Sequence, residues 1–459
     1  MRLAGLGDRL SDAEGYSWLV ASAPSASAFF DRLAAYENTP PLFYALLAPL
    51  PLDDEAWLRV PALLPALACV PVAYCLVRPL LGTRVALLTA LAVAVAPFHV
   101  SYSNYSRGFM LAALGLLLAA WAVARLAEGR RGRWWWLYLA GGTLALQSEY
   151  DALLFLAPLL ALPALWRRRG WKEVVLLGAL PLATLLPLAG EMLRGLDQLD
   201  VTKLTPPSSP LAPASLRDSL VSLFTGTHGL ADSAAVRTAQ LVVLLGALAG
   251  SAVLLWRRPE RASSGSQARS AAGAALAWLP PLDDSRRQIA FWLLVVAPAT
   301  AVVLHAIASI PGPEIFDSRY LVGLIPFACA LLAAGVDAMP WRAAMPVAAA
   351  CLLALAVAVF VQRYDRELHP DVAPAAALVE ASNARTVLTN SPVVAYYLRD
   401  SSAAVRLDRP FGLGNDEPGC ANDCPRPIVV VEDARLPGGL RAGPGATTPF
   451  GPVVARAIP

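Results

Sequence analysis

Charged residues are scarce in this chain of 459 residues, in which Asp, Glu, Lys and Arg together account for 15% of all positions. Soluble domains carry about 25% charged residues. The mean hydropathy is +0.53 and 57% of the residues are hydrophobic. The formal net charge of +3 is small and gives no indication of a nucleic acid partner. The composition therefore excludes an ordinary soluble protein and favours a membrane protein.

Histidine and cysteine are also rare, with four and six residues. The histidines are scattered without metal-ligand spacing, so we predict no metal site and no cofactor. No Gly-rich phosphate loop indicates a nucleotide site. Four cysteines lie in apolar segments and are predicted to be small core residues. Cys420 and Cys424 form C-A-N-D-C in the tail, where a disulfide and a reduced pair both remain open.

The apolar residues are gathered into ten segments, most of them about 17–22 residues long, which is enough for a helix to cross the ~30 Å hydrocarbon layer. Water does not satisfy the backbone there, so only helices are expected. We predict an all-α polytopic membrane bundle. Its ten segments are 55–81, 83–100, 106–127, 134–148, 150–166, 174–190, 239–256, 289–309, 320–338 and 343–361.

Basic residues cluster in every second gap between these segments, as in R-R-G-R at 130–133 and R-R-R at 167–169. The positive-inside rule places those gaps in the cytoplasm. The other gaps, the N-terminal segment and the tail then lie outside. We predict a multi-pass protein of the cell membrane whose active face and C-terminal domain are extracytoplasmic.

Three parts follow from this pattern. Residues 1–54 are an extracytoplasmic segment whose stretch 15–36 is typical of interfacial helices. Residues 55–361 are the transmembrane bundle. Residues 362–459 form a small α/β domain, with β-rich runs at 386–389 and 428–431, helix-like stretches at 373–382 and 392–399, and a final loop at 436–452.

Residues 1–54 contain neither a convincing span nor a signal peptide that would carry them across the membrane. Two explanations remain open. Either a first transmembrane helix lies upstream of this start, which we favour, or the first hairpin translocates a short, weakly charged N-terminus.

Ionisable residues near the outer ends of the spans are the candidate functional residues, since charge at membrane depth is costly and usually functional. Asp12 and Glu14 precede an aromatic pair, and either carboxylate is a candidate general base; the alternative is an exposed turn with Asp12 as a helix cap. Arg59, at the outer end of the first span, is either a snorkelling anchor or a ligand contact.

Three outer turns carry further candidates. Arg107 follows Tyr102 in a short outside turn, where a guanidinium suits bidentate binding of a phosphate; contact with lipid headgroups is the equal alternative. Glu149 is an acidic candidate at the same level. Arg319 either pairs with Asp317 or binds phosphate beside Tyr320.

The order and spacing of these motifs are distinctive together. They are E-G-Y-S-W at 14–18, P-P-L-F-Y at 40–44, L-R-V-P at 58–61, the turn 102–107 and R-Y at 319–320. With them the chain resembles the polyprenyl-phosphate-dependent glycosyltransferases of the GT-C type, which include the protein O-mannosyltransferases and the aminoarabinose transferases of lipid A (glycosyltransferase family 39). The resemblance covers residues 14–335.

The resemblance implies a membrane glycosyltransferase that takes a hexose or pentose from a polyprenyl phosphate, with inversion and without a metal, and passes it to a lipid, glycan or protein acceptor. It implies that Arg107 and Arg319 hold the donor phosphate and that Glu14 or Asp12 deprotonates the acceptor. The further substrate contacts expected are Tyr16, Arg59, Tyr102, Glu149, Tyr150 and Tyr320.

Two departures from the family keep other functions open. The family's Asp-Glu pair aligns with Ala13 and Glu14, so the first acid is absent unless Asp12 replaces it. Ser148-Glu149-Tyr150 stands where relatives often have Thr/Ser-His-Tyr. The alternatives are a lipid or polysaccharide transporter or flippase, and a catalytically inactive relative that acts as a scaffold.

Overall fold

A computed structural model of the chain describes most of the helical residues and the core of the tail. The described ranges are 5–37, 39–167, 171–188, 284–308, 318–339, 343–364, 385–389, 391–401, 404–407, 428–433, 447–450 and 453–458, with scattered positions at 3, 190, 217–252 and 377–381. Most of the stretch 191–238, half of the predicted span 239–256 and both tail cysteines lie outside the described residues.

Two compact units divide the chain. The first, here called the bundle unit, contains residues 1–2, 61–193 and 199–363. The second, the sheet unit, contains residues 3–60, 194–198 and 364–459. The N-terminal segment and the tail, which the sequence analysis treats as separate parts, thus belong to one unit, and the boundary falls inside the first long helix rather than before it.

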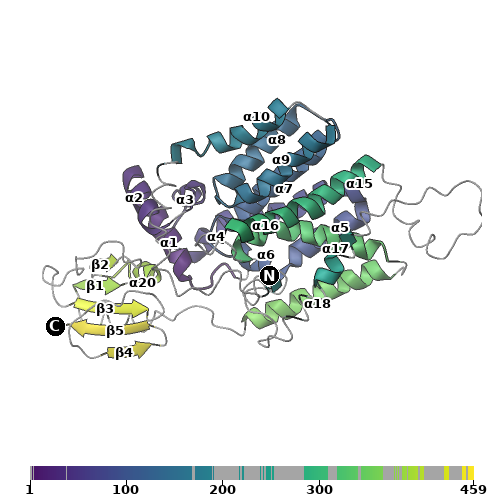
Figure 1. Ribbon diagram of the computed structural model, residues 1–459. Helices are drawn as coiled ribbons and strands as arrows, with labels where there is room; N and C mark the ends of the chain where they lie inside the picture. Colours follow the sequence, from purple (N-terminus) through teal and green to yellow (C-terminus); the bar gives the residue numbers. More distant parts are fainter. Residues whose placement is uncertain are drawn as a thin grey trace, which may run out of the picture. The chain divides into compact units, whose positions relative to one another are not determined.

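Helices make up the described part of the bundle unit (Figure 1). The long helix α4 enters it from the sheet unit. The helical elements are α4 (Glu55–Leu81), α5 (Thr83–Val95), α6 (Pro97–Ser103), α7 (Phe109–Ala127), α8 (Arg133–Leu146), α9 (Ala152–Arg167), α10 (Trp171–Ala183), η1 (Leu186–Leu188), α15 (Asp284–Phe291), η2 (Trp292–Val296), α16 (Ala297–Ala308), η3 (Ser318–Leu324), α17 (Ile325–Asp337) and α18 (Ala344–Tyr364).

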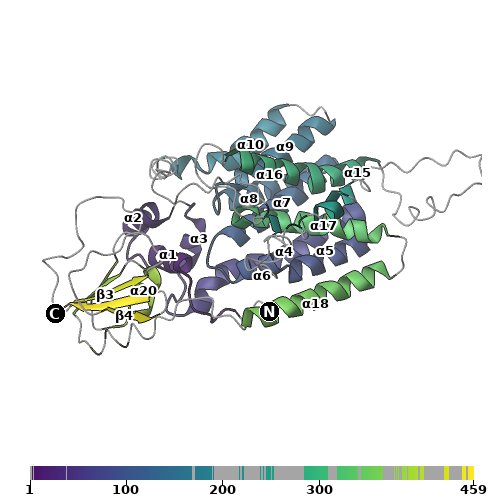
Figure 2. The same ribbon diagram turned by 60° about the horizontal axis from the view of Figure 1, so that its bottom comes forward.

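The core of this unit is centred on α7, which packs against α8 and α9 (Figures 1 and 2). Glycines let α7 and α8 approach closely. A Cβ on Gly115 would lie 2.6 Å from the carbonyl oxygen of Gly141, and a Cβ on Gly141 would lie 2.8 Å from the backbone nitrogen of Ala119. Small residues are typical of such crossings between membrane helices, where association depends on close packing.

The segment predicted as one span at 83–100 is broken in the structure. Helix α5 ends at Val95, α6 begins at Pro97, and their axes differ by 55°. Proline has no backbone N–H to continue the helix, and its ring disfavours helical geometry in the preceding residue, which here is Ala96. The bend and α6 lie directly before the turn that contains Arg107.

Several described helices are long and apolar enough to cross a membrane. Four qualify by length and composition, and the bent pair α5–α6 makes a fifth. The four are Glu55–Leu81, Phe109–Ala127, Arg286–Ala308 and Arg319–Asp337. The protein is therefore a multi-pass membrane protein, and the predicted class of a helical membrane bundle is confirmed. The other predicted spans contain shorter described helices or extend beyond the described residues.

The first half of the sheet unit consists of three short helices: α1 (Asp12–Ala21), α2 (Ala26–Tyr36) and α3 (Leu42–Leu47). The first two begin at serine N-caps. Ser11 accepts a hydrogen bond from the backbone of Glu14, and Ser25 accepts one from that of Ala28. These caps satisfy N–H groups that lack partners within the helix. They explain why helices start here despite the weak periodicity of the sequence.

The second half is a five-stranded mixed sheet in the order β2-β1-β3-β5-β4. The central strand β1 runs parallel to both β2 and β3, whereas β5 is antiparallel to its neighbours β3 and β4. Helix α20 (Pro392–Tyr397) follows β1. The strands are β1 (Thr386–Thr389), β2 (Ala404–Leu407), β3 (Ile428–Asp433), β4 (Thr447–Phe450) and β5 (Val453–Ile458).

The predicted strands at 386–389 and 428–431 and the predicted helix at 392–399 are confirmed as β1, β3 and α20. The predicted loop 436–452 is wrong at its end, where β4 forms. Pro449 obscures this strand in the sequence, but β4 is the last strand of the sheet, where a missing backbone donor is tolerated. Most of the predicted helix at 373–382 lies outside the described residues.

Helix α1 packs closely on α20. A Cβ on Gly15 would lie 2.8 Å from the backbone nitrogen of Val393, so only glycine fits this contact. The ring of Trp18 meets that of Tyr396 edge to face at 5.4 Å. The backbone N–H of Leu10 donates to the Tyr397 hydroxyl at 3.1 Å. These contacts bind the N-terminal segment to the tail domain within one unit.

Candidate functional site

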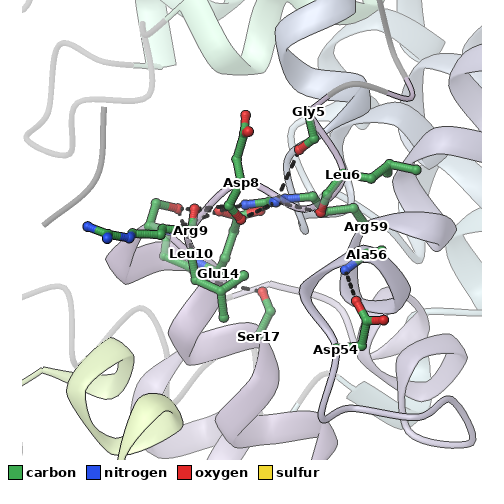
Figure 3. Close-up of polar contacts among 12 residues, drawn as sticks. Gly5, Leu6, Asp8, Arg9, Leu10, Glu14, Ser17, Asp54, Ala56 and Arg59 are labelled. Carbon is green, nitrogen blue, oxygen red and sulfur yellow. Dashed lines mark hydrogen bonds and ion pairs between the residues drawn. The ribbon is translucent and has the colours of Figure 1, made fainter. Parts of the chain in front are cut away.

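Glu14 and Arg59 form a buried ion pair in the sheet unit, although they are 45 residues apart (Figure 3). Arg59 Nε donates to Glu14 Oε1 at 2.8 Å, and Nη2 donates to Oε2 at 3.1 Å. Each side chain is 1% exposed. The two parallel bonds give the bidentate geometry in which arginine binds a carboxylate most strongly.

Backbone carbonyls surround the rest of the guanidinium (Figure 3). Arg59 Nη1 donates to the carbonyls of Gly5, Leu6 and Asp8, and Nη2 donates to that of Arg9 at 3.0 Å. Removing a charge from water costs several kcal/mol unless such partners replace the water. Arg59 therefore anchors the loop 5–9 and α1, a role that neither of the two interpretations from sequence anticipates.

The carboxylate of Glu14 is as fully engaged as its partner. Besides the two bonds from Arg59, its Oε2 accepts from the backbone N–H and the hydroxyl of Ser11, at 2.9 and 3.0 Å. Burial alone raises the pKa of Glu14, but the charge and hydrogen bonds of Arg59, with those of Ser11, outweigh burial and hold the pKa below its usual range. Glu14 is thus held as an anion.

The other predicted residues of this region lie close by. Asp12 opens α1, two positions before Glu14. Tyr16 is 7% exposed, and its ring stacks on that of Tyr36 at 6.1 Å. The N-terminal end of α1, which carries Asp12 and Glu14, is therefore held in place by the ion pair of Glu14 with Arg59 and by the packing of Tyr16 on Tyr36.

A second group of predicted residues comes together in the bundle unit, around the turn after α6. The ring of Tyr102 contacts those of Tyr105 and Phe109 at 5.4 and 5.3 Å, and the ring of Phe109 contacts that of Tyr320 at 6.0 Å. Arg319, which is exposed, lies over the Tyr320 ring at 5.0 Å. Tyr102 and Tyr320, more than 200 positions apart in the sequence, thus share one aromatic cluster.

The turn 147–151 packs against Gly108, which lies between Arg107 and Phe109. A Cβ on Gly108 would lie 2.6 Å from the carbonyl oxygen of Ser148 and 3.1 Å from Glu149 Oε1. The carboxylate of Glu149 is buried, and Arg107, the neighbour of Gly108 in the chain, is half-buried. Glycine at 108 is therefore what allows a carboxylate to lie directly beside the arginine turn.

His305 is a polar residue of this region that sequence reasoning missed. Its Nε2 lies 3.3 Å from Asp151 Oδ2, and its Nδ1 lies 2.8 Å from the carbonyl oxygen of Ala301. The signal was available, because His305 is an ionisable residue within an apolar span. Among the residues that the structure describes, no group of three His, Cys, Asp or Glu side chains has the geometry of a metal site.

The candidate residues thus form two sets, each within one unit. Asp12, Glu14, Tyr16 and Arg59 belong to the sheet unit. The bundle unit brings together the two arginine-bearing segments and the turn 147–151, through Tyr102, Arg107, Glu149, Tyr150, Arg319 and Tyr320. The second set combines positive charge, aromatic rings and a buried carboxylate, a combination suited to binding a phosphate and a sugar.

Comparison with known proteins places part of the chain beside one enzyme family. Residues 39–189 match the family described as "Dolichyl-phosphate-mannose-protein mannosyltransferase". Among curated proteins there is no match. The crystal structure of apo ArnT from Cupriavidus metallidurans has a TM-score of 0.44 with 14% identity, and that of the same protein bound to undecaprenyl phosphate has 0.39 with 14%. Each alignment covers 99% of this chain and 95% of the other.

The family match spans the first span, the arginine turn at 102–107 and the turn at 147–151. Over residues 39–189 the chain is similar to transferases that take a sugar from a polyprenyl-phosphate carrier, which confirms the resemblance that the sequence predicts.

Proposed function

We propose that the protein is a membrane glycosyltransferase that takes a sugar from a polyprenyl phosphate and transfers it to a lipid, glycan or protein acceptor on the extracytoplasmic face. One observation carries the proposal: the range that matches the mannosyltransferase family contains both outer turns that pack together around Gly108. The positive-inside charge pattern supports the assignment of these turns to the outer face.

The donor phosphate is assigned to Arg107 and Arg319. A polyprenyl phosphate leaves as an anion when its sugar departs, and guanidinium groups stabilise the charge that develops on it. Arginine offers paired N–H donors that match phosphate oxygens. The partly exposed rings of Tyr102 and Tyr320 offer flat apolar faces beside these arginines, and Glu149 and Tyr150 offer hydrogen-bonding groups for sugar hydroxyls.

The acceptor is assigned to the acidic end of α1. The acceptor hydroxyl gives its proton to a carboxylate and its oxygen bonds to the anomeric carbon, while the bond from that carbon to the phosphate oxygen breaks and the phosphate keeps the electron pair. Both oxygens of Glu14 already accept hydrogen bonds from Arg59 or Ser11. Because Glu14 is engaged in this way, we assign the role of proton acceptor to Asp12 and the role of positioning pair to Glu14 and Arg59.

The test is transfer of label from radiolabelled polyprenyl-phosphate sugars in membranes that contain the chain. Arg107→Ala should lower transfer by about ten- to a hundredfold, because a hydrogen bond to a charged group contributes about 1.5–3 kcal/mol. Asp12→Asn should remove turnover with folding intact. The matched control is Arg130→Ala, an arginine that is more than half exposed in the loop between α7 and α8. No transfer from any donor by the folded wild-type chain would overturn the proposal.

The same assay separates the two other functions. The bent pair α5–α6 is either a broken span or a re-entrant loop, and transporters use broken spans around a substrate site. A transporter would move labelled lipid across a vesicle membrane without a change in the glycan. A scaffold, which the alanine at position 13 would allow, would support its biological role even as Asp12→Asn. An enzyme should instead transfer sugar to the glycan, and it should lose its biological role as Asp12→Asn.

A further inference from the structure

The corner between α7 and α8 holds a polar cluster that the proposed sugar transfer does not use. Trp121, Arg125 and Glu128 are spaced four and three positions apart, which places their side chains on one face of a helix. Helix α7 is long and apolar enough to cross a membrane, and it ends at Ala127. The cluster therefore lies at the end of a candidate span, the level at which tryptophan and arginine contact lipid headgroups.

The backbone fixes Glu128 at this corner. The N–H of Gly129 donates to the carbonyl of Leu126, and the N–H of Arg130 donates to that of Arg125, both at 3.0 Å. These two bonds form a Schellman motif, which ends a helix with one residue in the left-handed region. Gly129 has a φ of 90°, which glycine adopts without strain. The chain therefore turns directly after Glu128 and leaves its side chain beside the last turn of α7.

The ion pair of Arg125 with Glu128 uses one atom of each group. Arg125 Nη1 donates to Glu128 Oε2 at 2.9 Å, and Arg130 Nε approaches the same oxygen at 3.5 Å. Arg125 Nε and Glu128 Oε1 are both buried, and neither has a hydrogen-bond partner among the described residues. Arg59 and Glu14, in contrast, pair through two parallel bonds. The corner thus retains one unused donor and one unused acceptor.

Trp121 supplies a second unused donor. Its Nε1 is buried and lacks a hydrogen-bond partner in the part of the chain that the structure describes. Its ring meets that of Trp134 edge to face at 5.4 Å. The guanidinium groups of Arg125 and Arg133 lie 5.7 and 5.0 Å from the centre of the same Trp134 ring. Trp121 and Arg125 therefore pack against one ring, and their N–H donors belong to one small cluster.

These three polar atoms indicate a ligand. Burial of a polar atom without a partner costs free energy, and such atoms are rare in folded proteins. The side chains of Arg125 and Glu128 are 16% and 14% exposed and that of Trp121 is half-buried, so the cluster reaches the surface of the unit. Four arginines and one glutamate within 125–133 make this surface positive. The matching ligand is an anion that has acceptor oxygens and also a hydrogen-bond donor.

We propose that Trp121, Arg125 and Glu128 bind the headgroup of an anionic phospholipid of the phosphatidylglycerol type. The phosphate oxygens accept from Trp121 Nε1 and Arg125 Nε, and a glycerol hydroxyl donates to Glu128 Oε1. The positive-inside rule assigns the loop 128–132 to the cytoplasmic face, where basic segments meet the negative surface of the membrane. The site lies at the opposite end of α7 from Arg107, so it is separate from the donor site.

Thermal unfolding of the delipidated full chain in detergent, with added dioleoyl phosphatidylglycerol, tests the site. The lipid should raise the unfolding midpoint in a saturable manner, because a ligand that binds the folded state stabilises it by mass action. Dioleoyl phosphatidylmethanol has the same charge but no hydroxyl donor, and it should bind about tenfold more weakly. Dioleoyl phosphatidylcholine should give no saturable shift.

Three results in this series would count against the proposal. An equal shift with phosphatidylcholine would overturn the headgroup site. Equal affinity for phosphatidylglycerol and phosphatidylmethanol would overturn the role of Glu128. Glycerol phosphate without acyl chains should not reproduce the shift at the same concentration, and a full shift with it would replace the lipid by a soluble phosphate.

The decisive variant is Trp121→Phe, which keeps a ring against Trp134 and removes Nε1. Without lipid, it should unfold at the wild-type temperature or above, since a buried donor without a partner is removed. Its affinity for phosphatidylglycerol should fall by about tenfold, because a hydrogen bond to a charged phosphate is lost. Trp136→Phe is the control: Trp136 lies in α8 and is 72% exposed, and its variant should keep the wild-type response.

A second variant reads the site through another residue. Arg125→Lys keeps the charge but lacks Nε, and it should also weaken binding of phosphatidylglycerol. If Trp121→Phe lowers the unfolding midpoint equally with and without lipid, Trp121 is a packing residue and the proposal fails. None of these measurements needs sugar transfer, so they decide the lipid site independently of the proposed function.

Discussion

The two regions with candidate residues use arginine in different ways. In the sheet unit, Arg59 is buried, and a carboxylate and four backbone carbonyls accept its hydrogen bonds. In the bundle unit, Arg107 is half-buried and Arg319 is exposed beside tyrosine rings. In the sheet unit the charge of Arg59 stabilises the fold. In the bundle unit Arg107 and Arg319 keep part of their surface exposed, where a substrate could reach it. Sequence motifs alone do not distinguish these uses, because burial decides between them.

The largest effect is expected from Arg59→Ala. This change leaves the Glu14 carboxylate buried without its cation, and breaking a buried pair in this way costs about 3–5 kcal/mol. The free energy of unfolding, measured by pulse proteolysis in detergent, should fall by that amount. The double variant Glu14→Gln with Arg59→Met removes both charges and should recover part of the loss. Equal stability of Arg59→Ala and wild type would contradict the anchoring role.

Arg107 should show the opposite behaviour. Arg107→Ala should weaken binding of a polyprenyl phosphate by about ten- to a hundredfold, since a charge-assisted hydrogen bond is lost, and leave the free energy of unfolding nearly unchanged. Arg107→Lys should recover only part of the affinity, because lysine lacks the paired donors. Isothermal titration calorimetry and unfolding measured on the same samples separate the two effects. A large loss of stability would instead make Arg107 a second anchor.

Acid should weaken the sheet unit. The pKa of Glu14 in the folded protein lies below its ordinary value of 4.5, so its contribution to stability is complete above 4.5 and is lost as pH falls through the folded pKa. The wild type should lose stability in this range, whereas Glu14→Gln should show a smaller dependence. Unfolding measured between pH 6 and pH 3 tests this, and parallel curves would contradict it.

Arg319 should give the smallest effect. It is exposed, and its contact with Tyr320 is a cation–π interaction at 5.0 Å. Exposed ion pairs contribute about 0.2–1 kcal/mol, because water screens them. If Arg319 holds the donor phosphate from this exposed position, Arg319→Ala should weaken donor binding by at most about fivefold. A loss as large as that of Arg107→Ala would show that both arginines hold the phosphate equally.

Local features were predictable from the sequence where one segment determines its own structure. The first span, 55–81, coincides with α4, since a long apolar run in a membrane has one stable state. The β-rich runs at 386–389 and 428–431 form neighbouring strands. The break before Pro97 was missed, since 83–100 was predicted as one span, although proline interrupts the helical hydrogen bonds.

Contacts between distant segments were not predictable in this way. The spacing of Glu14 and Arg59 gives no sign that they meet, since tertiary packing alone brings them together. The approach of Tyr320 to Phe109 and that of His305 to Asp151 have the same origin. In each case the residue type marks a candidate in the sequence, but its role depends on a partner from another part of the chain.

The contact between α1 and α20 has a consequence for how the protein is made. Leu10 can form its hydrogen bond only after Tyr397, 387 positions later in the chain, has been synthesised. At about 5–20 residues per second, translation leaves this gap open for roughly 20–80 s. During that time the first helices lack the surface that covers Gly15 and Trp18. The sheet unit therefore cannot complete its packing before its tail has been synthesised, and a chain that stops before the tail leaves its N-terminal helices without their packing partner.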